Sequence, residues 1–303
     1  MRLLQIAAVS LFLPAAALAQ PDWDKIEIQT SKIADGIYML QGAGGNIGLS
    51  VGADGAFVID DQYAPLSDKI MAAIRDVTDQ PVEFVLNTHY HGDHSGGNDA
   101  FGKAGAHIVA HDNVRKRLEE GGVNWNGTER PPAPADALPI ITFSDAMSFH
   151  WNGQDIRVWH LNAAHTDGDA VVYFKTANVV HMGDLFFNGG YPFVDVSSGG
   201  NLTGYMAFYD SVLRKVDDDV KIIPGHGALS NKADLVDYLD MLNEVRMRVA
   251  AQIDAGLSED DAVAADPLSD LNEKWGGGFI NGERMVRAAY QSLVAVRHSE
   301  NEH

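Results

Sequence analysis

The chain of 303 residues predicts an α/β fold of four layers, with sheets at the centre and helices outside. Two observations carry this prediction. Apolar, strand-like runs alternate along the chain with segments whose apolar residues recur at helical spacing. Histidine and aspartate residues gather at the joints, directly after the strand-like runs. The carboxyl ends of strands are where α/β folds assemble binding sites.

The first half of the chain consists of short strands joined by glycine-rich turns and by two helices. The expected strands span residues 37–40, 47–51, 56–59, 84–86 and 106–110. Ser67 is expected to cap a helix with one apolar face that ends before Asp79. A second helix is expected at 113–120, and a proline-rich loop at 131–139 is expected to separate the two halves.

The second half repeats this pattern. The pair Asn152-Gly153 indicates a two-residue hairpin turn between strands at 147–151 and 155–161. Further strands and helices are expected at residues 170–174, 179–182, 202–216, 220–223, 233–255 and 283–296. Residues 20–303 are therefore expected to form one domain, with the last ~50 residues as a helical extension.

The amino terminus is typical of a secretory signal peptide. Arg2 is followed by the apolar region Leu3–Leu13 and by the small-residue segment Ala17-Leu18-Ala19. We expect cleavage after Ala19 and a periplasmic or secreted protein. No later segment approaches the ~20 consecutive apolar residues that a membrane-spanning helix needs.

The composition limits the partners of the protein. Acidic residues number 42 against 22 lysines and arginines, which gives a formal net charge of −20. Such an excess repels phosphate backbones and acidic membranes, so nucleic acid and membrane partners are not expected. Cysteine is absent, which excludes disulfides and thiolate metal ligands. A small molecule is the expected partner, and the oligomeric state is left open.

Four potential metal ligands lie in the segment His89–His94, directly after a predicted buried strand. They are His89, His91, Asp93 and His94. Neutral imidazole and carboxylate are the ligands that zinc favours at sites that keep a position open for water. A solvated histidine-rich loop is the alternative interpretation.

Three further residues have the same position relative to a predicted strand. His165, Asp184 and His226 each follow an apolar run, with a glycine close by. A glycine there lets backbone and solvent approach closely. Asp60 ends the run at 56–59 in a similar way, and we expect it to hold a ligand histidine in its metal-binding tautomer.

Taken together, the motifs HYHGDH, HTDGD, MGD and PGHG resemble those of the metallo-β-lactamase superfamily, in order from about residue 36 to residue 227. The resemblance implies an αββα sandwich of two pseudo-symmetric halves with a dinuclear metal site at its edge. It implies that His89, His91 and His165 bind a first zinc ion. It also implies that Asp93, His94 and His226 bind a second and that Asp184 bridges the two. Fe or Mn would bind similar ligands.

The resemblance also implies a mechanism. Two metal ions about 3.5–4 Å apart lower the pKa of a bridging water, which becomes the nucleophilic hydroxide at neutral pH. Asp93 would orient that hydroxide. Familiar metallo-β-lactamases carry Cys or Ser where Asp184 stands, whereas thioesterases of the glyoxalase II type, lactonases and many other members carry Asp. The superfamily also includes exported members with a bridging Asp that resemble β-lactamases.

Three functions stay open at this point. The predicted export favours a zinc-dependent hydrolase that opens a β-lactam ring. The alternative of the same kind is a thioester or lactone hydrolase, similar to glyoxalase II or to lactonases. An alternative of another class is a metal-binding protein without activity. The complete set of seven ligands argues against this last alternative.

Aromatic and polar residues near the ligand motifs are candidates for the substrate pocket. The glycine-rich turn at 42–46 is expected to lie over the metals. The walls are expected to include Trp125, Asn126, Phe186, Tyr191 and Phe193. For the aromatic residues, packing in the core is the alternative.

Overall fold

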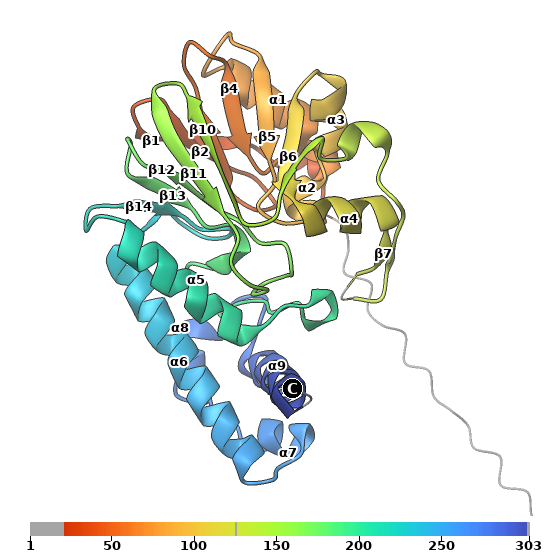
Figure 1. The fold of residues 1–303 in the computed structure, drawn as a ribbon, viewed down its shortest axis with the longest axis vertical. Coiled ribbons are helices and arrows are strands. Elements are labelled where there is room, and N and C mark those ends of the chain that lie inside the picture. The colour runs from red at the N-terminus through yellow and green to blue at the C-terminus, as the bar shows by residue number, and fades with distance from the viewer. Residues whose placement is uncertain (1–20, 125, 302–303) are drawn as a thin grey trace, which may run out of the picture.

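Two mixed β-sheets lie at the centre of the computed structural model, which describes residues 21–124 and 126–301 (Figure 1). In spatial order, the first sheet contains β1 (Gln29–Ala34), β2 (Ile37–Gln41), β3 (Ile47–Ser50), β4 (Ala56–Ile59), β5 (Val82–Leu86), β6 (His107–His111) and β9 (Ile141–Phe143). The second contains β10 (Ala146–Trp151), β11 (Gln154–Trp159), β12 (Val171–Phe174), β13 (Val179–His181), β14 (Lys221–Ile223) and β15 (Ser230–Asn231). A small hairpin pairs β7 (Gly122–Val123) with β8 (Glu129–Arg130).

Helices cover the outer faces of both sheets. The helices are α1 (Ser67–Arg75), α2 (Gly92–Ser95), α3 (Asn98–Lys103), α4 (Asp112–Glu120), α5 (Leu202–Lys215), α6 (Lys232–Asp254), α7 (Glu259–Ala264), α8 (Asn272–Trp275) and α9 (Gly282–Asn301). In Figure 1, α5, α6 and α9 lie on the opposite side of the sheets from α1 and α3. Within the described chain, no helix is both long enough and apolar enough to cross a membrane.

The buried side chains divide into layers that match this arrangement. Phe57 and Leu86 of the first sheet pack against Ile156 and Phe174 of the second, in one cluster between the sheets. The other face of the first sheet packs against α1 through residues such as Ile70. The other face of the second sheet packs against α5, α6 and α9. The predicted αββα sandwich is therefore confirmed.

The structure agrees with most predicted elements and corrects two details. The turn Asn152-Gly153 joins β10 to β11, and both residues have the positive φ angles, 51° and 70°, that a tight hairpin turn requires. Ser67 does not cap α1: it is the first helical residue, and its hydroxyl donates to the carbonyl of Ala64. The loop at 131–139 does not separate the sheets, because β9 follows it and pairs with β6 of the first sheet.

In each sheet, a pair of parallel strands ends at the same edge of the sandwich, so the carboxyl ends of these strands lie close together. β4 runs parallel to β5 in the first sheet, and β13 runs parallel to β14 in the second. Asp60 directly follows β4, Asp184 lies in a 3₁₀ turn shortly after β13, and His226 lies in the loop after β14. The segment with the histidine motif follows β5. The predicted signal peptide lies outside the described residues.

Candidate metal centre

Seven side chains converge at this edge in two groups of donor atoms. The first group contains His89, His91, His165 and Asp184, and the second contains Asp93, His94 and His226. Within each group, one donor atom of every residue lies within 4.8 Å of those of the others. The structure thus brings together all seven residues that the sequence predicted as ligands.

Asp184 faces both groups with different oxygen atoms. Its Oδ2 lies 3.4 Å from Nε2 of His165 and 3.8 Å from Nε2 of His89. Its Oδ1 lies 3.0 Å from Nε2 of His94 and 3.4 Å from Nε2 of His226. Oδ1 is fully buried, yet no donor in the described part of the chain is aligned to form a hydrogen bond with it.

The imidazole nitrogens that face inward are crowded against one another. Nδ1 of His91 lies 2.8 Å from Nε2 of His165 and 3.1 Å from Nε2 of His89. Nε2 of His94 lies 3.3 Å from Nε2 of His226. Lone pairs at such distances repel each other unless a cation lies between them. The donor set and the unsatisfied carboxylate oxygen therefore fit a pair of metal ions.

Four of the histidines are held by a partner on the nitrogen that faces away from the groups. Nε2 of His91 contacts Asp195 at 3.0 Å, and Nδ1 of His165 contacts the Phe193 carbonyl at 2.5 Å. These acceptors hold a proton on the outer nitrogen, so the inner nitrogen keeps its lone pair for a metal.

Asp60 anchors the other two of these histidines, one in each group. Its Oδ2 accepts from Nδ1 of His94 at 2.8 Å and from the Thr88 hydroxyl at 2.8 Å. Because that hydroxyl donates to Asp60, its oxygen is left to accept from Nδ1 of His89, at 3.1 Å. Asp60 itself adopts a φ of 62°, which few non-glycine residues adopt. The supporting role predicted for Asp60 agrees with these contacts.

Close approach of backbone to ligand side chains requires glycine at two positions. A Cβ atom on Gly45 would overlap the ring of His94, and one on Gly225 would overlap Oδ1 of Asp184. Gly45 also donates its N–H to the Asp93 carbonyl at 3.0 Å. The glycine-rich turn at 42–46 therefore packs directly on the second donor group, as expected.

The two groups differ in the charge that they hold. Burial lowers the pKa of His165 to about 4 and that of His89 well below its usual value. For His226, burial is outweighed by Asp184 and Asp93, which raise its pKa to about 9. Burial of Asp93 is likewise outweighed, chiefly by His94, so that its pKa falls to about 2. In the first group His89 and His165 are thus neutral imidazoles, whereas in the second group His226 is paired with carboxylate charge.

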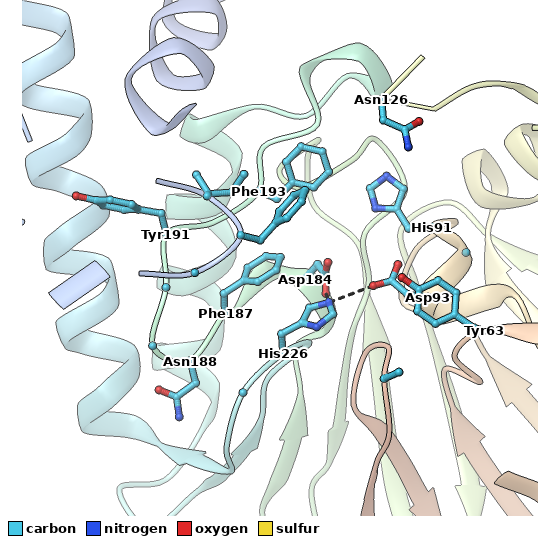
Figure 2. A pocket seen from close by; sticks show the side chains of 18 of the residues that line it. Tyr63, His91, Asp93, Asn126, Asp184, Phe187, Asn188, Tyr191, Phe193 and His226 are labelled. Atoms are coloured by element: carbon cyan, nitrogen blue, oxygen red, sulfur yellow. Dashed lines mark ion pairs between the residues drawn. The ribbon is translucent and has the colours of Figure 1, made fainter. Parts of the chain in front are cut away.

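A cavity of about 600 Å³ opens over both groups (Figure 2). Phe187 stacks on His226, with ring centroids 5.2 Å apart and planes 10° apart. Phe193 stacks on His91 in the same way, at 5.9 Å and 18°. The cavity is lined by Ala43, Tyr63, His91, Gly92, Asp93, Asn124, Asn126, Asp184, Phe187, Asn188, Gly189, Gly190, Tyr191, Phe193, His226, Gly227, Gly278, Phe279 and Ile280.

Only some of the residues predicted for the substrate pocket line the cavity. Asn126 and Phe193 line the cavity, whereas Trp125 lies outside the described residues. Tyr191 lines it as well, but its ring points away from His226 toward the C-terminal helices (Figure 2), and its hydroxyl donates to Asn272 at 3.1 Å.

Phe186 does not line the cavity. It is 1 % exposed and packs against Tyr209 and Tyr238 in the core between the second sheet and its helices. Its neighbour Phe187 lines the cavity instead, because successive residues of an extended segment point to opposite sides.

Several residues of the site lie in segments that carry no motif. Asp195 lies in the loop before α5, more than a hundred positions after His91, and its carboxylate accepts from Tyr90, Ser197 and Ser198 as well. Phe279 reaches the cavity from the segment between α8 and α9. The run of small and polar residues around each of them carries no motif.

Comparison with known proteins places these observations in a family. A sequence model of the metallo-beta-lactamase superfamily matches residues 42–226, which include all seven donors. The hydroxyacylglutathione hydrolase of Polaromonas sp. (strain JS666) is 27% identical over 168 residues, which are 55% of this chain and 57% of that protein. The probable metallo-hydrolase YqgX of Bacillus subtilis (strain 168) is 26% identical over 191 residues, with 58% of this chain and 85% of that protein covered. The chain thus spans little more than half the length of the first relative.

Solved structures show the same fold at low sequence identity. The stereoselective inverting sec-alkylsulfatase Pisa1 from Pseudomonas sp. aligns with 87% of this chain and 50% of its own, with a TM-score of 0.68 and 16% identity. A metallo-beta-lactamase from Pontibacter korlensis aligns with 72% of this chain and 99% of its own, with a TM-score of 0.60 and 18% identity. At such identities the likeness concerns the fold alone.

Proposed function

This chain belongs to the metallo-β-lactamase superfamily, and on that premise we propose that it is a metal-dependent hydrolase of a carbonyl bond in a small molecule. One observation carries the proposal. Two donor groups that share Asp184 lie at the base of a cavity large enough for a small substrate. A protein that only held metal ions would have no need of an open, ligand-sized cavity over the metal ligands.

The donors divide naturally between two ions. His89, His91 and His165 would hold one, Asp93, His94 and His226 would hold the other, and Asp184 would contact both through its two oxygens. Nitrogen and oxygen donors of this kind suit zinc, and Fe or Mn would bind them too. When bound, the two ions would supply Lewis acidity and lower the pKa of a water molecule between them.

The chain's own residues supply the rest of the chemistry. Asp93 faces the cavity beside Tyr63 (Figure 2), and its carboxylate can accept a hydrogen bond from the attacking water and so orient it. Burial raises the pKa of Tyr63 to about 12, so at neutral pH its hydroxyl is protonated and can donate to an oxygen that gains negative charge. Phe187 and Phe193 cover the two donor groups and exclude bulk water.

Two substrates deserve direct comparison. Ring opening of a β-lactam is favoured by the predicted signal peptide, because a periplasmic enzyme would meet antibiotics that act on the cell wall. Thioester hydrolysis is favoured by a different observation, the similarity to a hydroxyacylglutathione hydrolase over 55% of this chain. Export to the periplasm is part of the first proposal and is tested by fractionating cells that express the full-length chain.

The deciding experiment combines metal content with turnover. We would load the purified protein with zinc, count zinc per chain by mass spectrometry, and assay a chromogenic cephalosporin, S-lactoylglutathione and a 4-nitrophenyl ester with and without chelator. Two ions per chain and chelator-sensitive hydrolysis of any of these substrates are expected. Fewer than one ion per chain, or turnover that survives metal removal, would overturn the proposal.

A further inference from the structure

The walls of the cavity above the donor groups contain no lysine or arginine within the described part of the chain. The polar side chains of the walls are amides and a phenol, from Asn124, Asn126, Asn188 and Tyr63. The carboxylates at the base are Asp93 and Asp184. A substrate that carries its own carboxylate or phosphate, away from the bond to be cleaved, would meet no cationic partner on these walls.

Three arginines near the cavity are committed to other contacts. Arg117 forms a bidentate pair with Asp167, at 2.7 and 2.8 Å. Arg130 donates to the carbonyls of Arg117 and Gly121, at 2.6 and 3.0 Å. Their guanidinium groups also lie over the ring of Tyr90, and neither residue lines the cavity.

The third arginine, Arg284, contacts a residue of the cavity wall. Its guanidinium lies 5.4 Å from the ring centroid of Phe279 and donates to the Phe279 carbonyl at 3.1 Å. Arg284 itself is not among the residues that line the cavity. It therefore fixes Phe279 in place, and it is the residue to test as an alternative anion partner.

Three phenylalanines form the main apolar part of the walls. Phe187 and Phe193 stack on His226 and His91, one over each donor group. Phe279 meets Phe193 edge to face, with ring centroids 5.7 Å apart and planes 82° apart. Although it contacts Phe193, the Phe279 side chain is 51% exposed, which leaves apolar surface at the mouth of the cavity. An apolar group on the substrate would cover that surface.

This part of the wall comes from outside the segment that matches the family. Phe279 and Ile280 lie between α8 and α9, beyond residue 226 where the family match ends. Close to this segment, a hydrogen bond of 2.9 Å from the N–H of Tyr191 to the carbonyl of Trp275, the last residue of α8, joins it to the loop that holds Phe193. The family segment holds the donors, and the C-terminal helices add the surface that a substrate side group would touch.

The geometry points to an uncharged substrate, an ester or lactone whose aromatic or branched apolar acyl group packs on the surface that Phe193 and Phe279 form together. Anionic substrates, which include glutathione thioesters and the β-lactams that carry a carboxylate, are expected to bind weakly to walls without cations in a chain of net charge −20. This inference rests on the proposed hydrolase function and adds the substrate class. Phe279 is its specificity-determining residue.

The test compares substrates that differ by one charge. We would measure kcat/KM of the zinc-loaded protein for 4-nitrophenyl phenylacetate and for the same ester with a carboxylate on the phenyl ring. The neutral ester is expected to be preferred by at least about tenfold. Phe279→Ala should lower kcat/KM for the neutral phenylacetate ester about tenfold, chiefly by raising KM. The same variant should change kcat/KM for the smaller 4-nitrophenyl acetate by less than about twofold. Met247→Ala, at an exposed apolar position on α6, is the matched control and should leave kcat/KM for both esters unchanged.

A binding measurement separates this inference from the hydrolase function. Calorimetry with phenylacetamide and its ring-carboxylate analogue reports selectivity without turnover. Tighter binding of the neutral amide, together with no cleavage of the esters, the cephalosporin or S-lactoylglutathione, would overturn the hydrolase function and leave the selectivity standing. Equal or tighter binding of the anion would overturn the selectivity, and loss of that anion binding in Arg284→Gln would identify the cation responsible.

Discussion

The two donor groups of the centre contain similar side chains but are held very differently. In the first group, His89 and His165 are buried, and each of the three histidines has a partner on its outer nitrogen. In the second group, the His226 side chain is 33% exposed, and no hydrogen bond within the described residues holds its Nδ1. Phe187 stacks on its ring instead.

The difference shows how one centre can combine a preorganised and an adjustable half. In the first group, burial keeps His89 and His165 neutral, so an ion finds lone pairs ready. In the second, carboxylates keep His226 protonated near neutral pH, so a proton must leave before an ion binds. We therefore expect the first group to bind its ion more tightly and to lose it last when a chelator is added.

The strongest way to break the comparison is to remove the residue that both groups share. Asp184→Asn should lower zinc content from two ions toward one and reduce kcat/KM by about 10³-fold, because the shared carboxylate is lost from both. Metal analysis and steady-state kinetics measure this, with Asp210→Asn at an exposed position of α5 as the control. Two tightly bound ions and full activity in the Asp184 variant would show that the carboxylate does not bridge.

A second variant should weaken both groups at once without touching a donor. Asp60→Asn removes the negative charge and one of the two oxygen acceptors from the side chain that holds His94 directly and His89 through Thr88. Zinc affinity at both groups should fall up to about 100-fold, the upper end of the range for such supporting residues. Competition with a zinc-binding dye gives both constants. A loss of zinc affinity at the second group alone would mean that Asp60 does not hold His89 through the Thr88 hydroxyl.

The pH dependence of metal binding should sharpen the contrast between the groups. With no ion bound, the pKa of His226 is about 9, so below that pH the imidazole carries a proton that the metal must displace. Asp184, Asp93 and Asp60 outweigh burial and raise the pKa of His94 well above its usual value too, so it also gives up a proton. Second-group affinity should therefore fall at least about tenfold for each unit of pH decrease below about 9. His165, with a pKa of about 4, binds no proton over that range, so the first group should respond less. Dye competition at several pH values tests this, and equal slopes for both ions would contradict it.

The smallest expected effect concerns the first group alone. Asp195→Asn keeps an acceptor near Nε2 of His91 but removes the negative charge, so affinity at the first group should fall about tenfold and the second should be unchanged. Ser197→Ala, which removes only a hydroxyl on the other oxygen of Asp195, is the control. Equal losses at both groups would assign Asp195 a general structural role.

The sequence predicted the donors far better than their surroundings. His89 to His94 lie on one short segment after a strand, and this spacing directly reflects the geometry of the ligands. The αββα layers followed from the alternation of strands and helices, and the structure confirms them. By contrast, Asp195 and Phe279 reach the site through long-range packing, which leaves no local pattern in the chain.

Two errors have simple physical causes. Phe186 and Phe187 are adjacent and both aromatic, so composition could not tell which one faces the cavity and which one faces the core. The proline-rich loop at 131–139 has the composition of a boundary, yet β9 after it adds an edge strand to the first sheet. Pairing partners of a three-residue strand cannot be read from its residues.

The place of Asp184 between the groups has a mechanical consequence. His89, His91, Asp93 and His94 belong to the half that contains the first sheet, whereas His165, Asp184 and His226 belong to the half that contains the second. Ions bound by both sets would tie the halves together across a wide separation along the chain, as a disulfide would in a protein that had cysteines. Ion binding to the folded chain alone would then raise its unfolding temperature as zinc concentration rises. The bound ions would then stabilise the contact between the two halves of the sandwich as well as take part in hydrolysis.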